Sequence, residues 1–521
     1  MSKTALTRWG LLAVVALGFW AHAAVFDFVN DDAFISFRYA DNLVRHGELV
    51  FNVNERVEGY TNFLWTLLMA GVLKLGLDPV PWSKWLGMAF AAATLFVVAR
   101  FTARTEGQAS PWDALAPALL AGSPAFACWA TGGLETALFT FTSTAAWTTY
   151  LLERQSAVAG RPARPWSGLW LAAAAMTRPE GMLLWGLTGL HRLVELLWTQ
   201  RGRLRPTRQD WSWGFFFAVP FGAYYAWRWH YYGWPFPNTY YVKTGAKNFW
   251  GPGLRYLWSW FEAHPFLWMA PLLGALRREL PGGRMLRLQT LVGLITVALA
   301  VHVVRVGGDF MALQRFLVPL MPGLAVLVAL GLRTALEPAL RRAPRRLAVG
   351  ALLFAGLSAG WTVQVDRDAL RVDSQGGVDS IGWLAMFAEQ CTVIGKWLET
   401  QAPPEASLAI TAAGIVPYYS RLKTLDLLGL NDEWVAHNVP AHGNRPGHTK
   451  SAPPAYVEEK KVTYYIGHPD PVATRPRGGG RAGYAWRAVQ IPGLRIDPRR
   501  VRRPEEAQQD AWWGYWERTA P

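Results

Sequence analysis

Two adjacent carboxylates near the start of the chain are the first residues whose types could do chemistry. Asp31 and Asp32 follow an apolar segment, in the stretch "FVNDDAFISFRYADNLVRHGELVFNVNERVEGYTNFLW" that begins at Phe28. A carboxylate can act as a general base toward a hydroxyl group, or it can hold a divalent cation through its oxygen atoms. The alternative is that Asn30 caps a helix whose first turn favours acidic residues. Helix capping accounts for one carboxylate better than for both.

A second group of polar and aromatic residues lies in the same stretch. Arg38 falls within the predicted helix, and Glu58 and Tyr60 come directly before the next apolar segment. Because sugar sites combine acidic, basic and aromatic side chains, these three residues are candidates for substrate binding. The alternative is that they are interfacial residues beside a membrane helix.

Two polar interruptions separate apolar half-segments further along the chain. Glu135 lies in "ATGGLETALF", and Arg178 and Glu180 lie in "AAMTRPEGMLLW". Ionisable residues at membrane depth are costly, so they are candidates for function. The alternative is that Arg178 and Glu180 neutralise each other at a helix break made by Pro179 and Gly181.

Two loops contain cations that could bind an anion. In "YYGWPFPNTYYVKTGAKNF", Asn238 and Lys243 lie among aromatic residues, which could cover a prenyl chain while the lysine binds a lipid phosphate. The rings could equally form an ordinary interface belt. In "VVRVGGDFMALQRFLVPLMP", Asp309 and Arg315 could bind phosphate or brace Asp31.

The composition predicts that these residues belong to a membrane protein. Of the 521 residues 51% are hydrophobic and only 17% are charged, against roughly 25% in soluble domains. Apolar runs long enough to cross a bilayer recur along the first two thirds of the chain. The first run could be a signal peptide, but it is long enough for a helix and further spans follow. The predicted spans are residues 8–26, 61–77, 80–100, 113–130, 134–152, 166–178, 181–198, 211–230, 254–275, 287–304, 315–333 and 344–363.

Charge placement predicts the topology. The net charge of +15 comes largely from short loops between spans, which is typical of cytoplasmic loops and does not indicate nucleic acid binding. The outer loop 27–60 and everything after residue 364 then face outward. An inner N-terminus and an outer C-terminal domain require an odd number of crossings. We therefore expect about eleven transmembrane helices, with one of the twelve segments merged or re-entrant, either between 61 and 131 or at 166–198.

The two parts of the chain differ in character. Residues 1–363 form the predicted transmembrane domain. Residues 364–521 combine an amphipathic helix at 381–399 with short β-rich runs, which predicts a small α/β cap domain with some parallel pairing. Its last part is rich in Arg, Gly and Pro, so it is either a partly disordered basic arm or a surface for anionic head groups or an acidic polysaccharide.

Absent motifs narrow the class of protein. The two cysteines have no metal-ligand spacing, and the sequence has no GxxxxGK[ST], GxGxxG after a strand, HExxH or GxSxG motif. These absences argue against a nucleotide-driven cytoplasmic enzyme.

The quoted stretches resemble a known family. The first outer loop, together with "TGGLETALF", "TRPEG", "WPFPNTYYVKT", "GGDFMALQRFLVPL", "LDLLGLND" and "PGHTKS", resembles the GT-C superfamily of membrane glycosyltransferases, in the branch of the terminal β-(1→2)-arabinofuranosyltransferases. The resemblance implies a polytopic protein of the bacterial inner membrane with a periplasmic cap domain. It also implies a polyprenyl-phosphate sugar donor and a glycan or glycolipid acceptor on the periplasmic face.

The same resemblance assigns roles to residues. It implies that Asp31, together with Asp32, supplies the catalytic carboxylate, and that Lys243 and Arg315 bind the donor phosphate. His448 and Lys450 become the contribution of the cap domain, although Thr449 stands between them where relatives carry an acidic residue. The metal requirement stays unknown, with a divalent cation at the two aspartates as a candidate.

The sequence thus predicts transfer of a sugar, by resemblance arabinofuranose, to a cell-envelope glycan, and we expect Asp31 to be the base. A flippase or transporter of lipid-linked sugars is the alternative, since such proteins also place ionisable residues between broken helices. The sequence shows no internal repeat, and a cap domain is not needed for transport.

Overall fold

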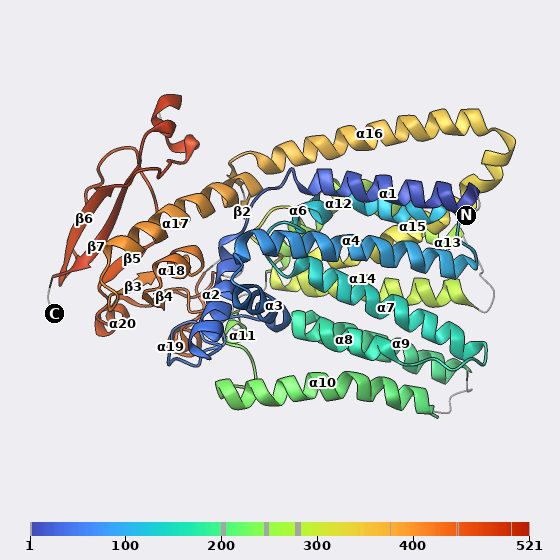
Figure 1. The fold of residues 1–521 in the computed structure, drawn as a ribbon, viewed down its shortest axis with the longest axis horizontal. Coiled ribbons are helices and arrows are strands. Elements are labelled where there is room, and N and C mark those ends of the chain that lie inside the picture. Colours follow the sequence, from blue (N-terminus) through green and yellow to red (C-terminus); the bar gives the residue numbers. More distant parts are fainter. Residues whose placement is uncertain are drawn as a thin grey trace.

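The computed structural model describes residues 3–199, 205–243, 249–276, 283–375, 377–443, 445, 448–501 and 503–519. Long helices lie side by side in a bundle, with the N-terminus at one end and the C-terminal domain at the other (Figure 1). We call the end that meets the C-terminal domain the cap end. Every predicted span falls on helical structure: α1 (Lys3–Ala23), α3 (Phe63–Lys74), α4 (Pro79–Glu106), α5 (Leu115–Ala121) with α6 (Pro124–Cys128), α7 (Thr136–Val158), α8 (Trp166–Thr177), α9 (Glu180–Thr199), α10 (Arg208–Tyr232), α12 (Trp250–Ala263) with α13 (Ala270–Leu276), α14 (Arg284–Val306), α15 (Met321–Arg342) and α16 (Pro344–Leu370).

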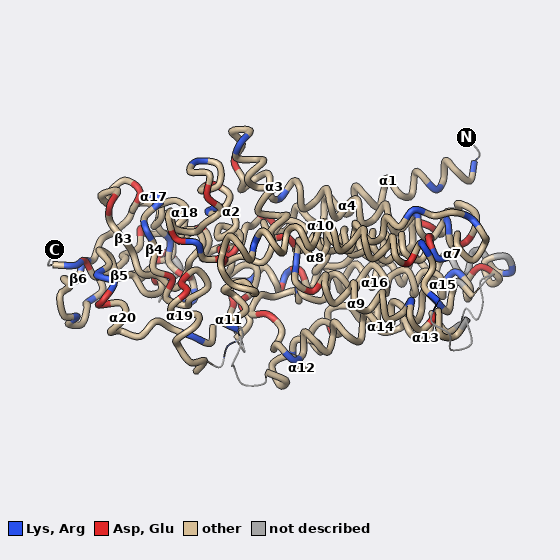
Figure 2. The backbone as a smooth tube through the Cα atoms, turned by 90° about the horizontal axis from the view of Figure 1, so that it is seen from below, with Lys and Arg blue, Asp and Glu red and all other residues tan. Residues whose placement is uncertain are grey.

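The outer surfaces of several helices are suited to lipid. On α10, Trp211 and Phe215 are 72% and 62% exposed, and on α16, Leu352 and Leu357 are 73% and 75% exposed. Large apolar side chains in such numbers would be unfavourable in water. Charged residues gather toward the two ends of the bundle, and its long middle carries few of them (Figure 2). Within the described residues, five helices are long and apolar enough to cross a membrane by length and composition alone.

Ion pairs at the two ends of α4 show which predicted segment does not cross. Lys84, near the start of α4, pairs with Asp27, just after the end of α1. Arg8, near the start of α1, pairs with Asp113 just after the end of α4, at 2.7 Å. Hence α4 runs antiparallel to α1, and α3 between them begins and ends at the cap end. A helix that begins and ends at the same end of the bundle does not cross it, and the 12 residues of α3 extend only about 18 Å. Setting α3 aside reduces the twelve predicted segments to the expected eleven.

The other candidate for merging consists of two separate helices. The Glu153 carboxylate on α7 accepts a hydrogen bond from the backbone N–H of Ser167 at the start of α8, at 3.0 Å. At the other end of α8, Arg178 pairs with Glu135 near the start of α7, at 2.8 Å. Because α8 lies against α7 between these two contacts and α9 starts anew at Glu180, the predicted spans 166–178 and 181–198 are two separate helices.

The C-terminal domain is a mixed sheet with helices against it, as the sequence predicted. The strand order is β4-β3-β5-β7-β6, in which β3 pairs in parallel with β4 and β5, while β7 is antiparallel to β5 and β6. The strands are β3 (Ser407–Ile410), β4 (Lys423–Asp426), β5 (Tyr464–Gly467), β6 (Tyr484–Gln490) and β7 (Trp512–Arg518). The helices are α17 (Ile381–Gln401), α18 (Ile415–Ser420), α19 (Glu433–Asn438) and α20 (Pro454–Glu459), and a two-stranded hairpin, β1 (Ser374–Gln375) and β2 (Val378–Asp379), precedes α17. We call this part of the chain, from β1 onward, the cap domain.

Candidate active site

The helix that carries the two aspartates lies between the bundle and the cap domain. α2 (Asp31–His46) begins where the Asn30 side chain accepts a hydrogen bond from the backbone N–H of Asp32 at 2.9 Å, and it ends at Gly47, whose φ is +72°. Both signals are ordinary helix ends, as expected for Asn at the N-cap and Gly after the last turn. Figure 1 shows α2 at the junction of the two parts of the molecule.

One face of α2 binds the cap domain. The Asp31 carboxylate accepts hydrogen bonds from the backbone N–H groups of Gly414 at 3.2 Å and Ile415 at 2.7 Å, at the start of α18. Burial raises the pKa of Asp31 to about 7. Two turns later, the Arg38 guanidinium donates to the carbonyls of Pro417 and Leu422 in the same part of the cap domain. Asp31 and Arg38 therefore fasten α2 to α18.

Asp32 faces a different environment. Within the described residues, its carboxylate makes no hydrogen bond with the protein, and the side chain is partly exposed. Burial raises the pKa of Asp32, and Arg315, His448 and Lys243 are close enough to oppose this rise through their charges, whereas Asp309 adds to it. A carboxylate that has no protein partner within the described residues and feels the charge of three basic side chains is available to a substrate.

Lys243 approaches the same space from α11 (Asn238–Lys243). Its side chain is exposed, yet desolvation by the surrounding protein lowers its pKa. The charges of Asp309 and Asp32 oppose this change, and that of Arg315 adds to it. A lysine that is both accessible and among charged groups fits a position at the edge of an open polar site.

Behind these groups lies a chain of hydrogen bonds centred on Arg178. Its guanidinium donates to Glu135 at 2.8 Å and to Glu180 at 2.7 Å. The Glu135 carboxylate also accepts a hydrogen bond from the side-chain amide of Asn62 at 2.9 Å. Breaking a buried ion pair leaves a charge uncompensated, so the three charged groups hold one another in place. The sequence-based alternative of a neutralising Arg178–Glu180 pair describes half of this network.

An aromatic ring joins this network to Arg315. The guanidinium carbons of Arg178 and Arg315 lie 4.9 Å and 5.1 Å from the centre of the Phe316 ring. Arg315 also pairs with Asp309 and lies 5.7 Å from the centre of the Trp129 indole. Sequence reasoning missed Phe316 and Trp129, because aromatic residues in apolar segments are ordinary core residues. The position of Phe316 directly after Arg315 was the available signal.

The backbone before Arg315 is held in an unusual conformation. Leu313 and Gln314 have φ values of +56° and +35°, in the left-handed region that residues with a Cβ seldom adopt. The Leu313 carbonyl accepts a hydrogen bond from Trp129 Nε1 at 2.9 Å, which helps to hold this turn. Strain of this kind clusters at functional sites, where it orients side chains. The turn leads into η3 (Arg315–Leu320), whose first residue, Arg315, pairs with Asp309.

The two residues predicted as the contribution of the cap domain, His448 and Lys450, lie in different surroundings. His448 lies against the Phe310 ring, with 4.9 Å between ring centres, and close to Asp32. Lys450 instead is buried and donates to the carbonyl of Ala436 at 2.6 Å. Of the two residues that the resemblance proposed for the cap domain, the structure brings His448 to the polar site and directs Lys450 away from it.

Three further predicted substrate residues are engaged within the protein. Glu58 forms a buried ion pair with Arg228, and the Tyr60 hydroxyl lies 3.2 Å from that of Tyr232. The Asn238 amide donates to carbonyls in the cap loop that includes Gly429 and Asp432. Like Arg38, these side chains lie where the outer loop packs against α10 or the cap domain, so the structure does not bring them to Asp32.

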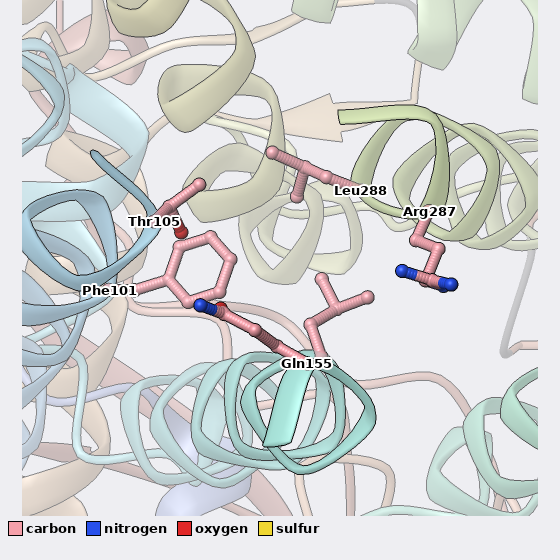
Figure 3. Close-up of a pocket in the computed structure, with 6 residues that line it drawn as sticks. Phe101, Thr105, Gln155, Arg287 and Leu288 are labelled. Atoms are coloured by element: carbon pink, nitrogen blue, oxygen red, sulfur yellow. The ribbon is translucent and has the colours of Figure 1, made fainter. Parts of the chain in front are cut away.

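No group of three or more His, Cys, Asp or Glu residues suited to a metal ion occurs in the part of the chain that the structure describes. Both Asp31 oxygens accept hydrogen bonds from backbone N–H groups, so a cation at the two aspartates would share these oxygens with the cap domain. A small recess between α4, α7 and α14 is lined by Phe101, Thr105, Leu151, Gln155, Arg287 and Leu288 (Figure 3). It has room for little more than a water molecule and lies at the far end of the bundle from Asp32.

Comparisons with known proteins agree with this arrangement. Over 358 aligned residues the chain is 30% identical to the terminal beta-(1->2)-arabinofuranosyltransferase of Corynebacterium glutamicum, and the aligned part covers 59% of this chain and 49% of that protein. The chain thus spans about half the length of this curated relative. Its fold is similar to that of ArnT from Cupriavidus metallidurans, in a crystal structure bound to undecaprenyl phosphate, with a TM-score of 0.54 and 14% identity over 80% of this chain and 85% of that one. Residues 383–513 match a family described as a domain of unknown function, DUF8728.

These findings bear on the predictions from sequence. The motif resemblance is confirmed as a distant homology to the arabinofuranosyltransferase, and the likeness to ArnT confirms the predicted GT-C-like fold. With its apolar helices and this fold, the chain is a multi-pass membrane protein.

Proposed function

We propose that the protein is a membrane glycosyltransferase that transfers a sugar from a polyprenyl-phosphate donor to a cell-envelope glycan. The observation that carries this proposal is the Asp32 carboxylate, which has no protein partner within the described residues and interacts electrostatically with Arg315, His448 and Lys243. A base beside a cluster of cations is what transfer from a phosphate leaving group to a hydroxyl acceptor requires. Arabinofuranose is the sugar that we propose, because a distant relative is a terminal arabinofuranosyltransferase.

In the proposed reaction the cations bind the donor phosphate. Arg315, Lys243 and His448 stabilise the negative charge that grows on the phosphate as the bond between it and the anomeric carbon breaks. The acceptor hydroxyl oxygen forms the new bond to that carbon and gives its proton to Asp32. The products are the extended glycan and the free polyprenyl phosphate.

The contacts favour Asp32 over Asp31 as the base, although the sequence led us to expect Asp31. Both Asp31 oxygens already accept hydrogen bonds from the cap domain, at Gly414 and Ile415. These two donors hold the Asp31 carboxylate against the cap domain, whereas within the described residues no protein donor engages the Asp32 carboxylate. We infer that Asp31 positions its neighbour by fixing the first turn of α2.

The Arg178 network has a supporting role in this scheme. Arg178 is held by Glu135 and Glu180 and stacks on the same Phe316 ring as Arg315. An arginine whose rotamer is fixed from three sides keeps the neighbouring cation in place without the entropy cost of ordering it during the reaction.

We propose that the cap end faces the periplasm. Basic loops at the opposite end of the bundle, such as the one around Arg161 and Arg164, follow the positive-inside rule for a cytoplasmic face. The polyprenyl chain of the donor would then enter from the bilayer near α11, where the aromatic residues Phe236 and Tyr240 are 47% and 46% exposed.

A transfer assay in liposomes tests the proposal. Purified protein is incubated with radiolabelled polyprenyl-phosphate arabinofuranose and an arabinan acceptor, with a nucleotide sugar as the control donor. We expect label in the acceptor from the lipid donor only. Absence of transfer from every polyprenyl-phosphate sugar supplied, together with movement of a fluorescent lipid-linked sugar between leaflets, would favour the flippase instead.

A further inference from the structure

The basic segment near the end of the chain is ordered, although its composition suggested a partly disordered arm. Residues 475–481, "RPRGGGR", contain three arginines and three glycines, and we call them the arginine segment. Its backbone carbonyls accept hydrogen bonds from two indoles of the sheet: Trp486 Nε1 donates to Pro476 at 3.0 Å, and Trp516 Nε1 donates to Gly479 at 3.4 Å. Ordering glycines costs more conformational entropy than ordering other residues, so these contacts offset a real cost.

A row of aromatic side chains on the outer face of the sheet forms the support for this segment. The rings of Trp486 and Trp516 lie 4.4 Å apart between centres on the paired strands β6 and β7, and Tyr465 on β5 lies 5.7 Å from Trp516. A Cβ atom at Gly478 would lie 2.1 Å from the Trp486 ring, so the segment approaches the row as closely as only glycine allows.

The arginines of this segment lack acidic partners, unlike their neighbours. Within the described residues no carboxylate pairs with Arg475, Arg477 or Arg481. Arg481 instead lies over the Tyr465 ring, with its guanidinium carbon 3.6 Å from the ring centre, and its Nε is buried without a hydrogen-bond partner.

Other arginines of the same region are paired with carboxylates. These are Arg487 with Glu517, Arg495 with Asp510 and Arg500 with Asp470. The contrast leaves an uncompensated positive charge at the arginine segment alone among these positions.

We propose that the arginine segment and its aromatic row form a binding site for an acidic polysaccharide, one that bears carboxylate or phosphate groups along a sugar chain. Guanidinium groups bind such anions through paired N–H donors, and the two indole hydrogen bonds already place the backbone of the segment before binding. Position distinguishes this ligand from anionic lipid head groups. Strands β6 and β7 lie at the end of the molecule farthest from the helix bundle, so the bilayer around the bundle does not reach them (Figure 1).

Binding of polygalacturonate to the full chain tests the site without any donor or transfer reaction. The protein is held in nanodiscs of uncharged lipid, and neutral dextran serves as the control polymer. The triple variant R475Q/R477Q/R481Q should weaken polygalacturonate binding about tenfold or more, and added salt should reduce binding by the wild type. The matched variant R487Q/R495Q/R500Q removes the same number of charges from paired arginines and should change the affinity less than about twofold.

A second variant separates placement of the arginines from their charge. Gly478→Leu keeps all three arginines but forces the segment away from Trp486, and it should also weaken binding. Equal losses in the two triple variants would mean that net charge alone attracts the polymer and would overturn the site. Unchanged binding in R475Q/R477Q/R481Q, equal binding of dextran, or binding that needs anionic lipid in the nanodiscs would each overturn it as well.

Discussion

Replacing Asp32 by asparagine should abolish most of the transfer activity while leaving the donor bound. A general base contributes about 100-fold to 10,000-fold to a rate, which corresponds to about 3 to 5 kcal/mol of barrier. An asparagine side chain at this position cannot take the proton of the acceptor hydroxyl, so we expect kcat to fall by that factor. Because the substitution removes a negative charge beside Arg315, Lys243 and His448, the KM for the anionic donor should stay the same or fall.

The matched control is Asp31→Asn, one residue earlier on the same helix. It removes one of two hydrogen-bond acceptors toward α18 and leaves Asp32 intact. We expect its kcat to fall less than about tenfold per folded molecule, since it leaves the base in place. Both variants are assayed in liposomes with radiolabelled polyprenyl-phosphate sugar at varied donor concentration. If Asp32→Asn retains more than about a tenth of the wild-type kcat while Asp31→Asn loses about a hundredfold, the assignment is refuted and Asp31 is the base.

Three further predictions concern stability. Arg178→Gln removes the cationic partner of the buried Glu135 and of the partly buried Glu180, and it should cost about 3 kcal/mol. The loss should appear as a drop in the melting temperature in detergent, and an unchanged melting temperature would contradict the network. The pKa of Asp31 is about 7 in the folded protein and about 3.9 in the unfolded chain, so its contribution to stability falls as pH rises from about 4 to 7. Asp31→Asn should therefore flatten the pH dependence of the melting temperature in that window. Parallel curves for the variant and the wild type would count against the assignment. Gly414→Ala places a Cβ 1.9 Å from the Asp31 carbonyl oxygen and should separate α18 from α2. We expect a loss of about 2 kcal/mol of stability and faster proteolysis between the bundle and the cap domain. A stability equal to that of the wild type would show that this contact is unimportant.

The two faces of α2 show how much of the site the sequence contained. Asp31, Phe34 and Arg38 are spaced by three and four residues, and all three contact α18 or the residues that follow it. Asp32 and Ser36 are four apart and face the bundle, where the Ser36 hydroxyl donates to Asn62 at 3.1 Å. Helical periodicity therefore separates the two aspartates onto different faces, although the sequence led us to treat them as one pair. Which face would meet the cap domain depended on tertiary packing that one sequence does not reveal.

Several predicted substrate residues turned out to be engaged elsewhere for a related reason. A buried polar residue in a loop can be satisfied by substrate or by the protein, and sequence gives its type but not its partner. Glu58 shows this clearly, because its partner Arg228 lies 170 positions later, on a helix predicted only as an apolar span. Strand β7 was missed because its sequence "WWGYWER" adjoins a stretch of Arg, Gly and Pro that suggested disorder. Its order comes from pairing with β5 and β6, which are distant in the chain.

The departure at Thr449 changes what the cap loop contacts. Where the family resemblance implied an acidic residue, the Thr449 hydroxyl donates to the carbonyl of Val242 at 3.2 Å. Val242 directly precedes Lys243, and His448 directly precedes Thr449. One hydrogen bond thus joins the two segments that bring these basic side chains toward Asp32 from the bundle and the cap domain. A carboxylate at this position would repel that carbonyl. We therefore propose that in this chain the cap loop helps to position the cations near Asp32 and adds no further negative charge there.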